Sequence, residues 1–134
     1  VFANLKLNAT AHYTYGSILG DTASSPLDHI PPFYGRISID KTINKKWGAS
    51  AWMIFNGEKP LSLYNVNGED NLIYATPTGM PAWQTLNFSL QLNPKEYMQL
   101  SLACENILDM NYRVFSSGIS SSGRLIRIQL KYNF

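Results

Sequence analysis

Apolar and polar residues alternate strictly at the end of the chain. The apolar positions of this segment finish on the terminal aromatic residue and are Ile126, Ile128, Leu130, Tyr132 and Phe134. A period of two places alternate side chains on opposite faces of a β-strand. Strands of outer-membrane barrels show this split because one face meets lipid and the other meets water, and half-buried strands of soluble sheets show it too. The last strand therefore leaves both kinds of protein open.

Five earlier segments alternate in the same way, so the pattern predicts an all-β fold of about six antiparallel strands. The expected strands cover residues 4–15, 33–44, 47–56, 85–93, 98–105 and 126–134. Lys41 interrupts the apolar face of the second strand, and Trp52 and Ile54 weaken the contrast in the third. No helical stripe competes with these assignments, and no apolar run approaches the roughly 18 residues of a transmembrane helix.

The connections between the expected strands are alternately long and short. The long ones span residues 17–32, 57–82 and 106–124, and the short ones are the turns at Asn44–Lys46 and Asn93–Glu96. Outer-membrane barrels have long extracellular loops and short periplasmic turns. They must close, because lipid cannot satisfy open backbone groups, and the smallest have about eight strands. We therefore interpret residues 1–134 as one up-and-down segment of a larger transmembrane β-barrel, with its C-terminus in the periplasm.

Composition changes this picture little. Charged residues make up 15% of the chain, against about 25% in soluble domains, and the net charge of +2 gives no reason to expect a nucleic-acid partner. The single cysteine, Cys104, excludes a disulfide framework within the chain. His12 and His29 have no companions at metal-binding spacing, so no metal site is expected.

No group of residues has catalytic spacing, and we predict neither an enzyme nor a cofactor. The serines of residues 116–122 lack a nucleophile elbow. Candidate ligand contacts lie in the second long connection and are Tyr64, Glu69, Asp70 and Tyr74. Tyr64, Tyr74 and Trp83 suit an aromatic ligand platform, although a position in the aromatic girdle at the membrane interface is the preferred interpretation of Trp83.

The third long connection carries residues that suit a fixed turn. Asn106 and Asp109 are expected to hydrogen-bond the local backbone, and Gly118 and Gly123 are expected to permit a positive φ. Structural roles are preferred over ligand contact for all four residues.

Residues 100–113 resemble the last part of TonB-dependent outer-membrane receptors. The shared pattern is hydrophobic-x-hydrophobic-x-x-Glu-Asn-hydrophobic-hydrophobic-Asp-x-x-Tyr-Arg, which here places Glu105, Asn106, Asp109, Tyr112 and Arg113. In that family this segment precedes the last extracellular loop and the terminal strand.

Three further segments resemble the same family. Gly118 and the pair Gly123-Arg124 match its Gly-rich last loop, and residues 30–36 match its Ile-Pro-Pro-aromatic-x-Gly-Arg strand start. Residues 69–72, followed by Gly79-Met80-Pro81, are similar to versions from gut-type, Bacteroidetes-like bacteria. The resemblance covers about residues 30 to 134.

The resemblance implies a barrel of about 22 strands with a plugged lumen, which imports a scarce nutrient with energy transmitted by TonB. Ferric siderophores, haem and cobalamin are the expected ligands. This chain would supply wall strands, three ligand-capturing loops and the terminal strand, which the barrel-insertion machinery would recognise. The residues of that insertion signal would be Ile126, Ile128, Leu130, Tyr132 and Phe134. Its partners would be outer-membrane lipid, the insertion machinery, the nutrient, and TonB and the plug domain through the full-length receptor.

Two other kinds of protein fit the alternation. A small soluble β-barrel would bind an apolar ligand on its inward face. A surface protein would associate with itself through the apolar faces of its sheets.

Overall fold

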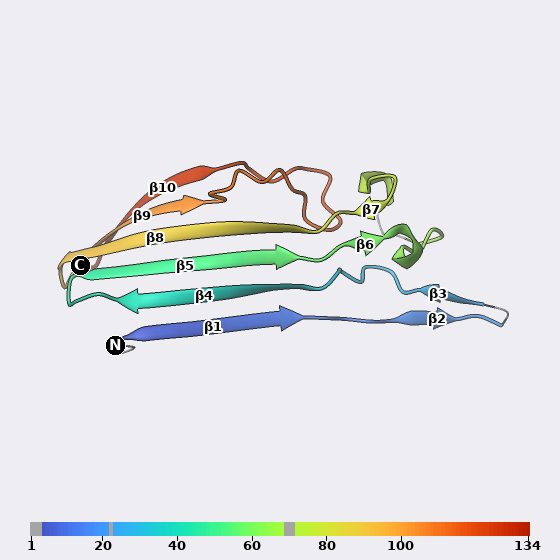
Figure 1. Cartoon of the computed structure of the whole chain (residues 1–134), viewed down its shortest axis with the longest axis horizontal. Helices are drawn as coiled ribbons and strands as arrows, with labels where there is room; N and C mark the ends of the chain where they lie inside the picture. Colours follow the sequence, from blue (N-terminus) through green and yellow to red (C-terminus); the bar gives the residue numbers. More distant parts are fainter. Residues whose placement is uncertain (1–3, 22, 69–71) are drawn as a thin grey trace.

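The computed structural model describes residues 4–21, 23–68 and 72–134. Its main feature is one antiparallel sheet with the strand order β1-β4-β5-β8-β9-β10 (Figure 1). These strands are β1 (Leu5–His12), β4 (Tyr34–Thr42), β5 (Trp47–Asn56), β8 (Trp83–Lys95), β9 (Met98–Glu105) and β10 (Leu125–Tyr132). Each lies beside the long strand that precedes it in sequence, which confirms the predicted all-β, up-and-down fold. No helix in the described residues has the length and apolar character needed to cross a membrane.

The strand limits follow the alternation closely, and the main differences are in β1 and β8. β5 and β9 match the predicted ranges, and β1 ends earlier than expected. β8 continues to Lys95, because the pairing with β9 shifts register between Leu92 and Lys95. Pro94 has no N–H to donate, and a bulge at this point lets the strand pass it without losing the rest of the ladder. The second short turn is therefore Glu96-Tyr97, between β8 and β9.

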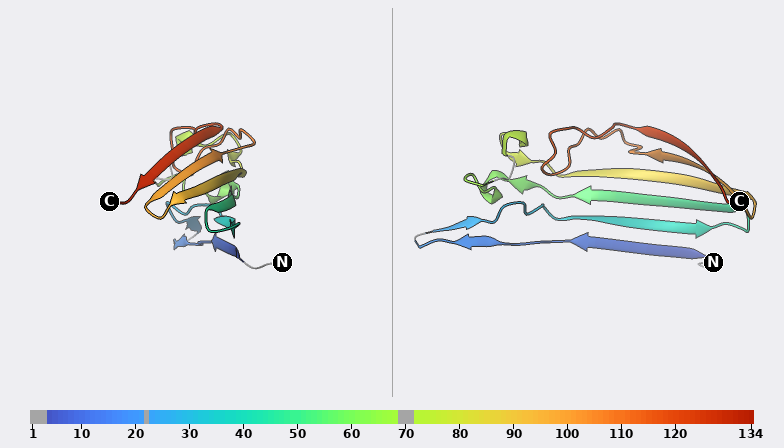
Figure 2. Two further views of the ribbon diagram at one scale, coloured as in Figure 1. Left: turned by 90° about the vertical axis from the view of Figure 1, so that its left-hand side faces the viewer. Right: turned by 180° about the vertical axis from the view of Figure 1, so that it is seen from behind.

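The long connections contain short elements that the alternation did not predict. The first has a hairpin of β2 (Ser17–Leu19) and β3 (Ser24–Pro26). The second has β6 (Lys59–Pro60) paired with β7 (Gly79–Met80), and the 3₁₀ turns η1 (Leu61–Leu63) and η2 (Leu72–Tyr74). All three long connections leave the sheet at one end, and the short turns and the C-terminus lie at the other (Figures 1 and 2).

The sheet buries polar side chains on one face and exposes apolar side chains on the other, which is the reverse of what is usual in a soluble protein. Thr85 is 2% exposed, whereas its neighbour Leu86, on the other face of β8, is 40% exposed. The strand residues that are buried in the described structure are mostly polar and include Ser38, Asn56, Thr85, Asn87 and Ser89. Along the terminal strand Ile126 and Ile128 are 68% and 73% exposed. In its central strands the sheet therefore shelters the polar face and presents the apolar face outward, whereas β10, at the edge, is exposed on both faces.

Hydrogen bonds between strands follow the polar face. The side chain of Asn8 donates to Ser38 and to Asp40, at 3.4 and 3.2 Å, and the hydroxyl of Ser50 donates to Asp40 at 2.6 Å. These residues come from β1, β4 and β5, so the polar face forms cross-strand pairs of the kind that stabilises a sheet.

Trp52 belongs to this polar face. It lies opposite Ser38 on β4 and Asn87 on β8, and the Arg36 guanidinium lies 5.3 Å from the centroid of its ring. The weak alternation in this strand thus has a physical cause, because tryptophan on the polar face gains a cation–π contact.

Candidate functional site

The turn that follows β9 is built around Asn106. This residue is 5% exposed and has a φ of 51°. Its backbone N–H donates to the side chain of Asn87 at 2.9 Å. Its side-chain amide donates to the carbonyl of Met110 at 2.9 Å and accepts from the N–H of Met110, also at 2.9 Å. Asparagine tolerates a positive φ better than most residues, so one side chain both permits and closes the turn. The bonds to the local backbone agree with the prediction, whereas the positive φ was not predicted.

Asp109 connects this turn to the start of β10. Its carboxylate accepts the backbone N–H of Arg124 at 2.7 Å, and Asp109 itself has a φ of 54°. The Arg124 side chain donates through Nε to the carbonyl of Ile107 at 2.9 Å. The carboxylate thus bonds a backbone N–H fifteen residues away, and not the local backbone as predicted, and it ties the turn to the start of β10.

The prediction that Gly118 and Gly123 permit a positive φ is wrong. Neither has a positive φ, and the non-glycine residues Asn106, Asp109 and Ser116 adopt one instead. Both glycines instead lie close to side chains of other segments. A Cβ on Gly123 would lie 2.5 Å from the carboxylate of Asp109, and a Cβ on Gly118 would lie 3.1 Å from the ring of Tyr74.

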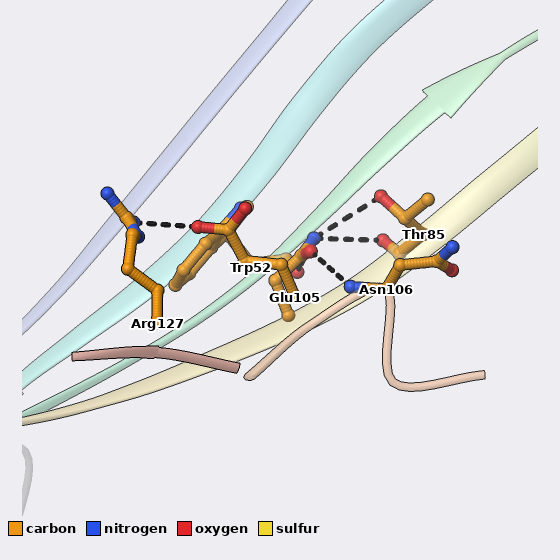
Figure 3. Close-up of polar contacts among 6 residues, drawn as sticks. Trp52, Thr85, Glu105, Asn106 and Arg127 are labelled. Carbon is orange, nitrogen blue, oxygen red and sulfur yellow. Dashed lines mark hydrogen bonds and ion pairs between the residues drawn. The ribbon is translucent and has the colours of Figure 1, made fainter. Parts of the chain in front are cut away.

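Glu105 faces the polar side of the sheet, next to the same turn. Its carboxylate accepts a hydrogen bond from the Arg127 guanidinium at 2.7 Å, between the side chains shown in Figure 3. Asn87 joins the group by donating to Thr85 and to the carbonyl of Trp52. A groove of about 690 Å³ runs over these residues beneath the third long connection. An exposed ion pair adds little stability. The groove is lined mostly by polar side chains, so it is chiefly a polar surface.

A second hollow of about 440 Å³ lies between the second and third long connections. We call it the loop cavity. Aromatic rings, hydroxyls and one guanidinium line it, and its main members are Tyr64, Tyr74, Trp83, Tyr112, Arg113 and Ser117. Its volume falls within the range of about 300–1,000 Å³ that is usual for small-molecule sites.

The loop cavity brings together the three aromatic residues of the predicted platform. Trp83 packs against Tyr112 with ring centroids 4.1 Å apart. Trp83 lies opposite Asn56 and shares the polar face with Thr85. The girdle interpretation of Trp83 is therefore corrected, because a girdle residue would lie on the apolar face. The role of Tyr64 and Tyr74 in ligand contact stays a prediction, and Glu69 and Asp70 lie outside the described residues.

Lys59 holds the walls of the loop cavity together. It is 2% exposed and donates from Nζ to the carbonyl of Ile30 at 2.9 Å. The same ammonium lies 4.5 Å from the ring centroid of Tyr64 and 4.2 Å from that of Phe115. Its partners come from all three long connections. Lys59 and Phe115 were not among the sequence candidates, since no pattern in the sequence relates them.

Arg113 and Tyr112 complete the cavity wall from the third long connection. Arg113 donates to the carbonyl of Tyr74 at 3.2 Å, and its backbone bridges to Ser120. The Glu-Asn…Tyr-Arg segment therefore has two parts. Asn106 and Asp109 fix the turn that follows Glu105, whereas Tyr112 and Arg113 reach the loop cavity.

The predicted insertion signal lies on the outward face of β10. Ile126, Ile128, Leu130 and Tyr132 are all at least half exposed, and Phe134 follows the strand with its side chain fully exposed. The ring of Tyr132 contacts Phe134 and Tyr97 at centroid distances of 5.1 and 5.3 Å. The placement suits recognition by another molecule, and that role stays a prediction.

The described residues contain no group of three or more His, Cys, Asp and Glu side chains that could hold a metal ion. His12 instead stacks on Tyr34, with ring centroids 4.8 Å apart. Cys104 is a free, half-buried thiol within β9.

No family profile and no curated protein matches this sequence. Among solved structures, the copper transporter OprC is similar over 100% of this chain, with a TM-score of 0.78 and 17% sequence identity. The chain spans 22% of the length of that structure. At this identity the similarity is one of fold alone, and it is consistent with the sheet being part of a larger β-barrel.

Proposed function

We propose that this chain is a wall segment of a TonB-dependent outer-membrane receptor that imports a scarce nutrient. The observation that carries the proposal is the inverted distribution of side chains. Thr85, Asn87 and Ser89 are sheltered on one face, whereas Leu86 and Phe88 are 40% and 44% exposed on the other. Lipid outside and a polar lumen inside stabilise such a sheet, and water on both sides does not.

The edges of the sheet support a larger barrel. β1 pairs with β4 and β10 pairs with β9, so each edge strand has one hydrogen-bonded neighbour in the sheet. Open edges carry unpaired backbone groups, which lipid cannot satisfy. Further strands of the same protein would pair with both edges.

The loops and the terminal strand fit the same orientation. Long connections gather at one end and short turns at the other, which in an outer-membrane barrel are the extracellular and periplasmic ends. The C-terminus would then be periplasmic, with residues 126–134 available to the insertion machinery. The plug domain would face the polar side of the sheet, and TonB would act through the plug.

The nutrient would be captured by the loop cavity. Its aromatic and hydroxyl lining suits a small molecule with a flat or ring-shaped part, and ferric siderophores, haem and cobalamin remain the proposed ligands. The name of OprC adds copper to the candidates, although the described residues offer only the thioethers of Met80 and Met110 at the cavity wall.

Fractionation of the native cells tests the proposal. Mass spectrometry of each fraction would identify the protein that contains the peptides of this chain. A parent of several hundred residues in the outer membrane is the expected result. A free soluble protein of 15.1 kDa would overturn it in favour of a small ligand-binding barrel, and concentration-dependent oligomers without detergent would favour a self-associating surface protein.

A further inference from the structure

The apolar face changes character at the short-turn end of the sheet. Over most of its area this face carries aliphatic side chains and the rings of Phe55 and Phe88, which have no polar group, but near the short turns it carries Trp and Tyr. Trp47 is 38% exposed, Tyr97 is 46% exposed and Tyr132 is 50% exposed. Trp and Tyr concentrate at the boundary between hydrocarbon and headgroups, because their rings are apolar and their N–H and O–H groups are polar.

Two lysines stand on the same face at the same end. Lys41 lies opposite Leu5 and Ala49 in the sheet register, among the outward residues of the neighbouring strands. Lys95 lies opposite Met98, which itself lies opposite Tyr132. The register shift between Leu92 and Lys95 is what turns Lys95 outward. The bulge thus places an ammonium group beside the aromatic cluster.

The adjoining turns extend this positive charge. Lys45 and Lys46 are exposed in the turn between β4 and β5 and add two positive charges. Glu96, in the turn between β8 and β9, offsets one of them. Lysines on a lipid-facing surface extend their ammonium groups toward the headgroups while their methylene chains stay in the apolar layer. Basic residues near a membrane surface are attracted to anionic lipids.

We propose that this end of the apolar face, with Lys41, Lys95 and the turn lysines Lys45 and Lys46, is a binding surface for the headgroups of anionic glycerophospholipids. The occupant follows from the charge and from the position. Phosphate groups complement the four ammonium groups, and the aromatic rings fix the depth of the headgroup layer. This inference rests on the proposed membrane location, and it goes beyond that proposal by assigning the lipid class that contacts this end.

Lipid retention by the full-length protein tests the inference. The protein that contains this sequence would be purified in detergent and reconstituted with equal amounts of phosphatidylglycerol and phosphatidylcholine. Native mass spectrometry would then count the lipids that remain bound. We expect phosphatidylglycerol to be retained in preference to phosphatidylcholine, and the preference to fall by roughly fivefold for each outward lysine replaced.

The informative variant is Lys41→Gln combined with Lys95→Gln. The control is Lys131→Gln, which removes one positive charge at the same end but from the polar face of β10, opposite Gln99, and is compared with the double variant per charge removed. A second variant, Lys45→Gln with Lys46→Gln, changes only an exposed turn and keeps the test valid if the strand variant fails to fold.

Three results would overturn the inference. They are equal retention of the two lipids by the unaltered protein, equal effects per charge removed of the outward variants and the Lys131→Gln control, and exclusive retention of lipopolysaccharide. Each of them leaves the receptor proposal intact if the protein fractionates with the outer membrane. Absence from the membrane would instead overturn the receptor proposal itself.

Discussion

Trp83 and Tyr112 face each other where β8 begins and the third long connection passes over it, with ring centroids 4.1 Å apart. Both rings line the loop cavity. We expect Trp83→Leu to weaken ligand capture at least tenfold, because aromatic contacts with a bound ligand supply affinity that a leucine does not replace. Binding of ferric siderophores, haem, cobalamin and copper to outer-membrane vesicles would measure the effect.

The matched control for Trp83→Leu is Trp47→Leu, which removes the same ring from the apolar face at the other end of the sheet. It should leave ligand capture unchanged. Equal loss in the two variants would show that Trp83 acts through folding and not through the cavity.

Lys59 and Phe115 are the basis of a second prediction, about the rigidity of the long connections. Replacing Lys59 with Met removes a hydrogen bond to Ile30 and two cation–π contacts, each of which contributes about 0.5–2 kcal/mol. We expect faster cleavage of all three long connections by proteinase K, while the barrel stays intact. Lys46→Met, in an exposed turn, is the control. Cleavage at the rate of the unaltered protein would contradict the proposed role of Lys59.

The strands could be predicted from the sequence because a period of two is a local property. β5 and β9 were found at their observed limits even though Trp52 blurred the pattern, since a single contact with Arg36 accounts for the exception. The bonds between Asn106 and Met110 were also predictable, because they join residues only four positions apart, whereas the bonds of Asn106 to Asn87 and Ser122 depend on the fold.

The loop cavity could be predicted only in part. Tyr64, Tyr74 and Trp83 were recognised as a set by residue type, and the structure brings them together. Lys59 and Phe115 were missed because their pairing depends on how two long connections fold over each other. The same dependence explains Gly118 and Gly123, whose small size matters only through the approach of Tyr74 and Asp109.

A third prediction concerns the turn after β9. Asn106→Ala removes the bonds to Met110 and places alanine at a φ of 51°. We expect the free energy of local opening to fall by about 2–4 kcal/mol. Hydrogen exchange at the amides of Met110 and Arg124 would measure it. Asn106→Gly, which accepts the same φ, should lose less than the alanine variant, and an equal loss in both would assign the effect to the hydrogen bonds alone.

The terminal residue gives a fourth prediction. Phe134 is fully exposed at the end of the outward face and contacts Tyr132. Phe134→Ser in the full-length protein should lower its yield in the outer membrane sharply, because the insertion machinery would lose the terminal aromatic ring. Tyr97→Ser removes the other ring in contact with Tyr132 and should have a much smaller effect. A membrane yield equal to that of the unaltered protein would remove Phe134 from the insertion signal.

The last prediction separates the wall from the loops. Deletion of residues 57–82 removes Lys59, Tyr64 and Tyr74, and with them one side of the loop cavity. The six long strands lie outside this segment, which begins directly after β5 and ends directly before β8. We therefore expect the shortened protein to lose ligand capture and still resist SDS until it is heated, since resistance depends on the closed ladder of strands. Gel migration before and after heating measures this resistance. Its loss would show that the second long connection stabilises the barrel, and retained ligand capture would show that the nutrient binds elsewhere in the receptor.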